Sequence, residues 1–164
     1  MNPLQHRSGT LPAGRDFRLE IVLLAAGIVT MAFGLLTLLG WVSGWPLLAS
    51  FGANRIPMAP STAVLFLAFG AAICLRARAP LSRRAFRFSL ALVGLGTFVA
   101  LGLFVLGWLH TQWAGEHLGL NLTGTVGGAP IGHMSLVTAF CFVLAGGSFL
   151  ASLSRSAIRP WRAA

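Results

Sequence analysis

Four apolar runs, each long enough to cross a lipid bilayer, restrict the folds open to this chain. A helix rises 1.5 Å per residue, so about 20 apolar residues cross a hydrocarbon core about 30 Å thick. Apolar residues make up 56% of the chain and charged residues only 9%, whereas about a quarter of a soluble domain is charged. We therefore predict an all-α integral membrane protein with four transmembrane helices, at residues 21–41, 60–75, 88–109 and 134–153.

A segment of thirteen residues recurs 76 residues later. Residues 58–70 read MAPSTAVLFLAFG and residues 134–146 read MSLVTAFCFVLAG, with five identities. Four of these identities are spaced four residues apart, which places them in one drifting stripe on an α-helix. We predict that the stripes pack in the bundle interior; the alternative is that they line a pocket for a lipid-soluble ligand. The stripes consist of Met58, Thr62, Phe66 and Gly70 in the first copy and Met134, Thr138, Phe142 and Gly146 in the second.

The repeated unit is larger than the stripe, because the apolar run before each copy ends in Gly-Trp, at residues 40–41 and 107–108. We predict two tandem helical hairpins, at residues 19–76 and 87–154, within a transmembrane domain of residues 19–154. The two copies enter the membrane in the same direction, which predicts a pseudo-twofold axis along the membrane normal and a four-helix bundle. Small residues four apart favour close packing of these helices: Thr30 with Gly34, Gly70 with Cys74, Gly96 with Ala100, and Gly147 with Ala151.

The arginines predict the orientation. All the basic residues are arginines, and eleven of the twelve lie before the first run, between the second and third, or after the fourth; the exception is Arg55. Basic residues resist translocation, so we predict a cytoplasmic basic N-terminus at residues 1–18 and a cytoplasmic basic tail at residues 155–164. A net charge of +9 also suits nucleic acid, but no basic segment interleaved with aromatic residues is present, so we expect lipid headgroups as the partner and no nucleic acid.

Tryptophan gives an independent indication, because its amphipathic ring prefers the membrane interface. Four tryptophans fall at the outer ends of the first and third runs, where we expect them to anchor the helices: Trp41, Trp45, Trp108 and Trp113. The first run exceeds the 7 to 15 apolar residues of a signal peptide. We therefore interpret it as a retained span.

Side chains that could bind a metal or a proton cluster in the loop before the fourth run. Three histidines and one glutamate, His110, Glu116, His117 and His133, lie on the predicted outer face. Imidazole and carboxylate groups suit a divalent metal or a response to pH, but the spacing matches no compact metal motif. The favoured interpretation is that these histidines are either solvated or hydrogen-bonded to the backbone. Haem ligation is weaker still, since none of these histidines lies in mid-membrane, and we expect no cofactor.

Other reactive residues are few. Cys74 and Cys141 differ by roughly 10 Å in predicted depth, which is too far for a disulfide, and both are interpreted as small packing residues. The predicted spans contain no acidic residue of the kind that marks an ion or proton path. No Ser-His-Asp set and no phosphate-binding glycine loop is present. We therefore predict a protein that is not an enzyme.

The repeated motif resembles a known signature. Met58-Ala59-Pro60-Ser61-Thr62-Ala63, and Gly132-His133-Met134-Ser135 followed by Thr138-Ala139, resemble segments of the multi-span membrane input regions at the N-termini of bacterial PAS-containing sensor histidine kinases and diguanylate cyclases. In that family the second copy usually reads Gly-Arg-Met-Ser-Pro-Asn-Thr-Ala. This chain instead has His133, Leu136 and Val137 at the three differing positions.

The resemblance implies a signal-input module of the bacterial cytoplasmic membrane, without an output domain in this chain. Such a module would act through a membrane or cytoplasmic signalling protein as its partner. The alternative is a structural accessory subunit of a larger membrane complex.

Overall fold

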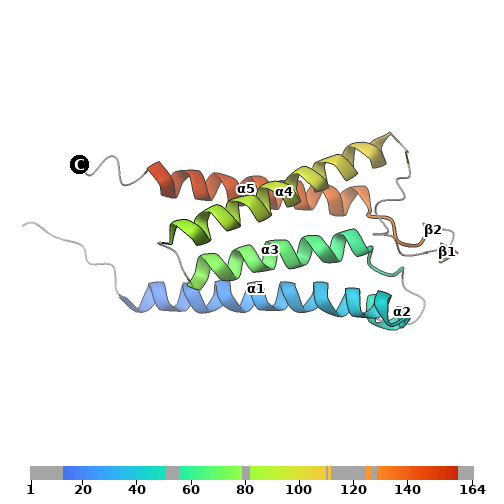
Figure 1. Ribbon diagram of the computed structural model, residues 1–164, viewed down its shortest axis with the longest axis horizontal. Helices are drawn as coiled ribbons and strands as arrows, with labels where there is room; N and C mark the ends of the chain where they lie inside the picture. Colours follow the sequence, from blue (N-terminus) through green and yellow to red (C-terminus); the bar gives the residue numbers. More distant parts are fainter. Residues whose placement is uncertain are drawn as a thin grey trace, which may run out of the picture.

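The computed structural model describes residues 13–50, 56–78, 82–109, 111, 125–126 and 129–158. This part of the chain is almost entirely helical (Figure 1). Its elements, in order, are α1 (Ala13–Val42), α2 (Pro46–Ser50), α3 (Pro60–Arg78), α4 (Arg83–Trp108), β1 (Thr125–Val126), β2 (Ala129–Pro130) and α5 (Leu136–Ile158).

Helices α1, α3, α4 and α5 are each long and apolar enough to cross a membrane, as the sequence predicts. The corresponding segments are Phe17–Val42, Pro60–Arg78, Arg83–Trp108 and Leu136–Ser154. Large apolar side chains stand exposed on the outer faces of these helices, where a soluble protein would place polar groups. Examples are Ile28, Phe33 and Leu39 on α1, Phe98 and Leu101 on α4, and Val137 and Leu144 on α5. The chain is therefore a candidate multi-pass membrane protein.

The helix ends differ from the predicted spans because polar residues continue a helix after the apolar run has stopped. Helix α4 begins at Arg83 rather than at residue 88, since the Ser82 hydroxyl accepts a hydrogen bond from the Ala85 N–H at 3.4 Å and caps the helix. Helix α3 likewise continues to Arg78, beyond the predicted end at residue 75. Helix α5 begins at Leu136, two residues later than predicted.

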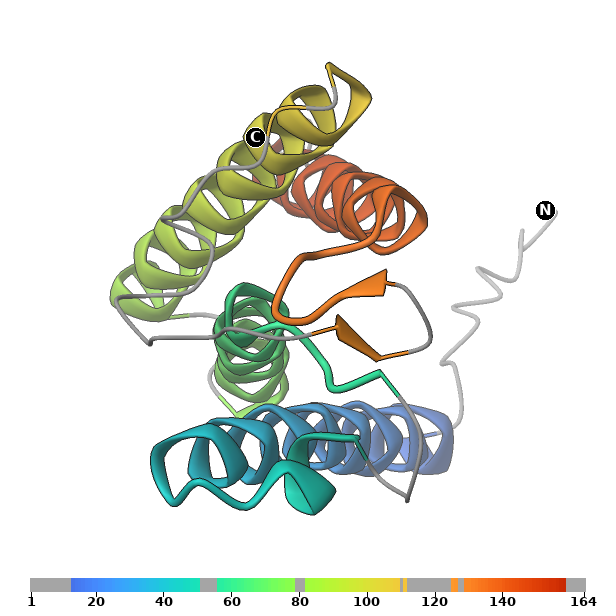
Figure 2. The same ribbon diagram turned by 90° about the vertical axis from the view of Figure 1, so that its right-hand side faces the viewer.

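The helices pack in the order α1, α3, α4, α5. Helix α1 packs on α3, α3 packs on α4, and α4 packs on α5, with a smaller contact between α3 and α5. Figure 2 looks along α3, which lies between α1 and the α4–α5 pair. Among the described helices, α1 contacts only α2 and α3, so the arrangement is an open bundle that leaves much of α1 uncovered.

Glycines bring α1 and α3 close together. A Cβ at Gly70 would lie 2.8 Å from the Gly27 carbonyl oxygen, and a Cβ at Gly34 would lie 2.6 Å from the Ala63 carbonyl oxygen. In an antiparallel pair, two small residues seven apart on each helix meet in this way. Side chains at these positions would force the backbones apart, which explains the preference for small residues in apolar helix pairs.

Gly146 makes the close contact between α4 and α5. A Cβ at Gly146 would lie 2.9 Å from the Thr97 Cβ. The expected pairing of Gly147 with Ala151 is wrong, because both residues are exposed and no atom of the described chain lies within 4 Å of a Cβ at Gly147. One residue along a helix is a rotation of 100°, so the interface falls on Gly146.

Three short elements, α2, β1 and β2, were not predicted. Helix α1 ends at a tight turn in which Gly44 has φ 69° and the Trp45 N–H donates to the Gly40 carbonyl at 2.9 Å, a glycine-terminated helix end. Helix α2 follows this turn and packs on α1. Strands β1 and β2 form an antiparallel pair of two residues each. Figure 1 places α2 and both strands at the end of the bundle opposite the start of α1.

Candidate functional site

A cavity of about 430 Å³ lies where the two repeated segments face each other, at the N-terminal ends of α3 and α5. Five of the eight stripe residues line it: Met58, Thr62, Phe66, Met134 and Thr138. The remaining lining residues are Ile56, Pro57, Ala59, His133 and Ser135. The volume lies in the range of small-molecule sites, and an apolar wall with a few polar groups is typical of such sites.

The first copy is held by three hydrogen bonds to Met58. Its N–H donates to the Ala49 carbonyl at 2.8 Å, and its carbonyl accepts from the Trp41 indole N–H at 2.8 Å. Its thioether sulfur accepts from the Thr37 hydroxyl at 3.5 Å. Because Thr37 is fully buried, this methionine is fixed from the side of α1.

The second copy is held by its own helix start. The Ser135 hydroxyl accepts from the Thr138 N–H at 3.1 Å and lies 2.7 Å from the Thr138 hydroxyl. Ser135 thus caps α5 and orients one of the hydroxyls that line the cavity. The second methionine of the cavity, Met134, packs against the buried core.

The two helix starts are built alike. The Ala63 N–H donates to the Ala59 carbonyl at 3.1 Å, and the Ala139 N–H, 76 residues later, donates to the Ser135 carbonyl at 3.0 Å. Ala63 and Ala139 are both buried. The repeated sequence therefore enters its helix with the same hydrogen bond in both copies.

Equivalent phenylalanines meet beside the cavity. The rings of Phe66 and Phe142 lie 5.3 Å apart at 75°, and Phe69 and Phe142 lie 5.4 Å apart at 67°. Both are edge-to-face contacts, which aromatic rings prefer. Phe142 is 8% exposed, so this cluster is part of the core that connects α3 to α5.

The last two stripe residues lie outside the cavity. Gly70 packs against Gly27 and Met31 of α1, and Gly146 packs against Thr97 of α4. Each stripe thus faces two neighbours. The methionine, threonine and phenylalanine at its N-terminal end face the other copy, and its final glycine faces the preceding long helix. The sequence periodicity groups the four residues but does not indicate this division.

Of the predicted metal set, only His133 lies within the described residues, where it lines the cavity; His110, Glu116 and His117 lie outside them. In the described part of the chain, no group of three His, Cys, Asp or Glu side chains is close enough to hold a metal. The metal hypothesis stays a prediction.

The predicted interface anchors differ in their surroundings. Trp45 and Trp108 are about two-thirds exposed, Trp41 is partly buried and donates to Met58, and Trp113 lies outside the described residues. The hydrogen bond from Trp41 to Met58 could not be predicted from the sequence, which indicates only that Trp41 lies close to the turn at Gly44.

The two cysteines are both free. Cys74 lies beside Gly27, where a Cβ would come within 2.6 Å of its sulfur. Cys141 is exposed on the apolar outer face of α5. A packing role therefore fits Cys74 but not Cys141.

No protein family, curated protein or solved structure matches this chain.

Proposed function

We propose that this chain is a non-catalytic signal-input module of a bacterial cytoplasmic membrane. It consists of two tandem hairpins, α1–α3 and α4–α5, with both ends in the cytoplasm. A small lipophilic molecule enters the cavity between the repeated segments, α5 shifts against α3, and a partner protein detects the shift at the cytoplasmic ends of the helices. The observation that carries the proposal is the cavity itself, because equivalent residues of both copies line it.

Duplication is supported by a second repeat that precedes the first. Helices α1 and α4 align at a spacing of 67 residues with seven identities, at residues 23, 27, 30, 36, 39, 40 and 41 of α1. Thr30 and Thr97 are one of these pairs, and each hydroxyl donates to the carbonyl four residues earlier, at 2.7 and 2.6 Å. The spacings of 67 and 76 residues differ because the second connection is nine residues longer.

The orientation is supported by the distribution of arginines in the described residues. Arg18, Arg76, Arg78, Arg83 and Arg84 lie near the start of α1, the end of α3 and the start of α4, which Figure 1 places at one end of the bundle. The cavity lies toward the other end. Reporter tags inserted after Ala53 and Thr123 should therefore reside outside the cytoplasm, and cytosolic tags would contradict the orientation.

A mechanism of this kind requires that ligand binding favour one helix arrangement over another. Helix α5 is suited to respond, because it contacts α3 chiefly through the phenylalanine cluster while most of its packing is on α4. Ser135 and Thr138 are at its start, so a molecule that bonds to their hydroxyls acts directly on the end of the helix.

The test uses a kinase output domain fused after the last residue, with its activity measured as membrane-active compounds and osmolarity are varied in cells. We expect Thr138→Phe, which fills the cavity, to abolish the response. The matched control Val137→Phe lies one residue away on an exposed face and should respond like the unmodified fusion. An output that never varies, or a Thr138→Phe variant that responds normally, would contradict the proposal.

The second candidate function, a structural accessory subunit, is favoured by the uncovered face of α1. Ile21, Val29, Leu35 and Leu39 are half exposed or nearly so on this helix, and an apolar face of that extent also suits a partner helix. Purification from native membranes distinguishes the two. A stoichiometric membrane partner bound along α1 supports the accessory role, and a monodisperse protein without partners contradicts it.

A further inference from the structure

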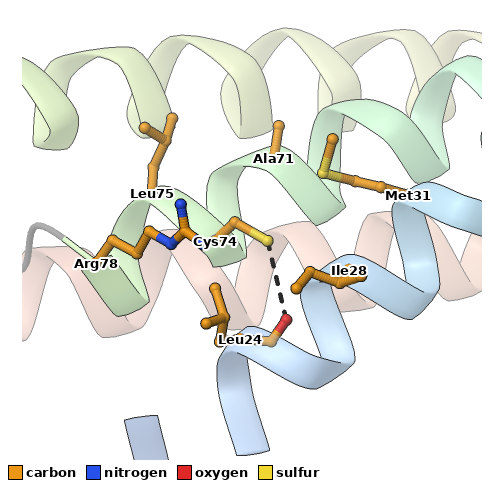
Figure 3. Close-up of a pocket in the computed structure, with 7 residues that line it drawn as sticks. All are labelled: Leu24, Ile28, Met31, Ala71, Cys74, Leu75 and Arg78. Atoms are coloured by element: carbon orange, nitrogen blue, oxygen red, sulfur yellow. Dashed lines mark hydrogen bonds between the residues drawn. The ribbon is translucent and has the colours of Figure 1, made fainter. Parts of the chain in front are cut away.

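Two adjoining cavities lie between α1 and α3, toward the arginine-rich end. The first, about 410 Å³, is lined by Leu24, Ile28, Met31, Ala71, Cys74, Leu75 and Arg78 (Figure 3). The second, about 270 Å³, shares Leu24 and Arg78 with the first and adds Phe17, Glu20, Ile21 and Ala77. All the lining residues are at least partly exposed, so both cavities open to the surroundings of the protein.

The polarity of this pair of cavities changes along the helices. In Figure 3, Met31 lies at one end of the first cavity and Arg78 at the other, with apolar side chains and Cys74 between them. The Cys74 thiol is directed at the Leu24 carbonyl at 4.0 Å. From Gly70, which packs against Met31, to Arg78 is eight residues of α3, or about 12 Å. The result is an apolar groove that ends in charged groups.

Those charged groups lie near the ends of two candidate membrane spans, where lipid headgroups are expected. Arg78 is the last residue of its candidate span, and Glu20 is one turn inside the start of its own. They line the same small cavity, yet within the described residues they form no ion pair with each other. A cation and an anion therefore line one space without pairing with each other.

We infer that this groove binds a phosphatidylethanolamine molecule, with an acyl chain between α1 and α3, the phosphate on Arg78 and the ammonium on Glu20. A guanidinium pairs well with phosphate oxygens. A primary ammonium carries three hydrogen-bond donors, which a carboxylate accepts. The inference rests on the membrane location proposed above, but not on the ligand or the output of the first cavity.

Glu20 is what distinguishes this headgroup from others. Arginines near the cytoplasmic surface attract anionic lipids in general, and Arg78 alone would favour phosphatidylglycerol. The phosphatidylglycerol headgroup has no cationic group that could pair with Glu20. Phosphatidylcholine carries a quaternary ammonium, which has no N–H to donate. Phosphatidylethanolamine alone among these three supplies both the phosphate and a hydrogen-bonding cation.

The experiment is native mass spectrometry of the purified full chain in detergent, titrated with the three phospholipids carrying identical acyl chains. We expect the unmodified protein to bind phosphatidylethanolamine about fivefold more tightly than phosphatidylcholine, which corresponds to one solvent-exposed ion pair. Glu20→Gln should remove this preference and leave phosphatidylcholine binding unchanged. Arg78→Gln should weaken binding of all three lipids by a similar factor.

Three controls make the result specific. Arg83→Gln removes an arginine that lines neither cavity and should bind like the unmodified protein. Ala71→Leu fills the groove without changing charge and should weaken all three lipids equally. Glycerophosphoethanolamine, the headgroup without acyl chains, should not displace the lipid at equal concentration.

Two results would overturn the inference: a Glu20→Gln variant that retains the preference, or an Arg83→Gln variant that loses as much binding as Arg78→Gln. Displacement by the free headgroup would also refute a site that depends on an acyl chain. Because the assay requires neither a particular orientation nor a signalling output, its failure is distinguishable from failure of the kinase-fusion test.

Discussion

A methyl group at position 146 should force α4 and α5 apart. The backbone of α5 at Gly146 lies so close to Thr97 that an added Cβ would be 2.9 Å from the Thr97 Cβ and 3.0 Å from its Cγ2. Thr97 cannot turn away freely, because its hydroxyl donates to the Val93 carbonyl at 2.6 Å. The change Gly146→Ala therefore meets a side chain that is held in place.

The neighbouring glycine provides the reference for the magnitude. Gly147→Ala adds the same methyl where no described atom lies within 4 Å, so it should gain the helix propensity of alanine, about 1 kcal/mol. Gly146→Ala gains the same amount but loses roughly 1 to 3 kcal/mol to overpacking, plus about 1 kcal/mol if Thr97 gives up its hydrogen bond. We expect the two variants to differ by about 2 kcal/mol in the free energy of unfolding.

The assay is equilibrium unfolding in mixed micelles of mild detergent and dodecyl sulfate, followed by circular dichroism. Both variants carry one added methyl on adjacent residues of the same helix, so they change the composition of the chain identically. The double variant Thr97→Ala with Gly146→Ala should recover part of the loss, since the Thr97 Oγ1 and Cγ2, two of the three atoms nearest the added methyl, are then absent. If Gly146→Ala is as stable as Gly147→Ala, the close approach of α4 and α5 is refuted.

Three further predictions use the same unfolding assay. Ser61 is buried and its hydroxyl has no hydrogen-bond partner among the described residues, so Ser61→Ala should stabilise the protein by about 1 kcal/mol; a loss of stability would show that the hydroxyl is bonded. Trp41→Phe should cost about 1 kcal/mol, because it removes the 2.8 Å hydrogen bond from the indole N–H to the Met58 carbonyl. Trp108→Phe, at the equivalent but exposed position, should change stability by less than about 0.5 kcal/mol. Equal effects of the two changes would contradict a stabilising role for the Trp41 hydrogen bond. Phe142→Ala should cost about 3 to 5 kcal/mol, because it empties the centre of the aromatic cluster. The control Phe98→Ala, on the exposed face of α4, should change stability little. A small loss at Phe142 would mean that the packing of α5 does not depend on that cluster.

Hydropathy predicted the four long helices because a span requires about 20 predominantly apolar residues in succession, a pattern that is visible in the sequence alone. Their ends were predicted less well. Ser82 starts α4 through a hydrogen bond to Ala85, and Arg83, Arg84 and Arg87 then continue the helix although they interrupt the apolar run. Hydropathy measures transfer from water, whereas helix ends are decided by capping groups.

The candidate site was predicted in part. Spacing by four residues groups Met58, Thr62 and Phe66 on one face, since helix periodicity is a local property, and all three line the cavity. The same spacing could not show that Gly70 faces α1 while Phe66 faces α5. It also could not choose between Gly146 and Gly147, which depends on how α5 is rotated against α4. The cavity exists only through the relative placement of α3 and α5, which no local pattern encodes.

The order in which the helices pack has a consequence for biogenesis. Nearly every helix interface joins chain neighbours among the long helices, so each helix leaving the translocon finds its docking surface already in the membrane. Such a protein has low contact order and avoids a search for distant partners. Co-expressed as separate polypeptides, the α1–α3 and α4–α5 halves should therefore insert independently and reassemble, with the α3–α4 surface and the ring of Phe142 as their points of recognition.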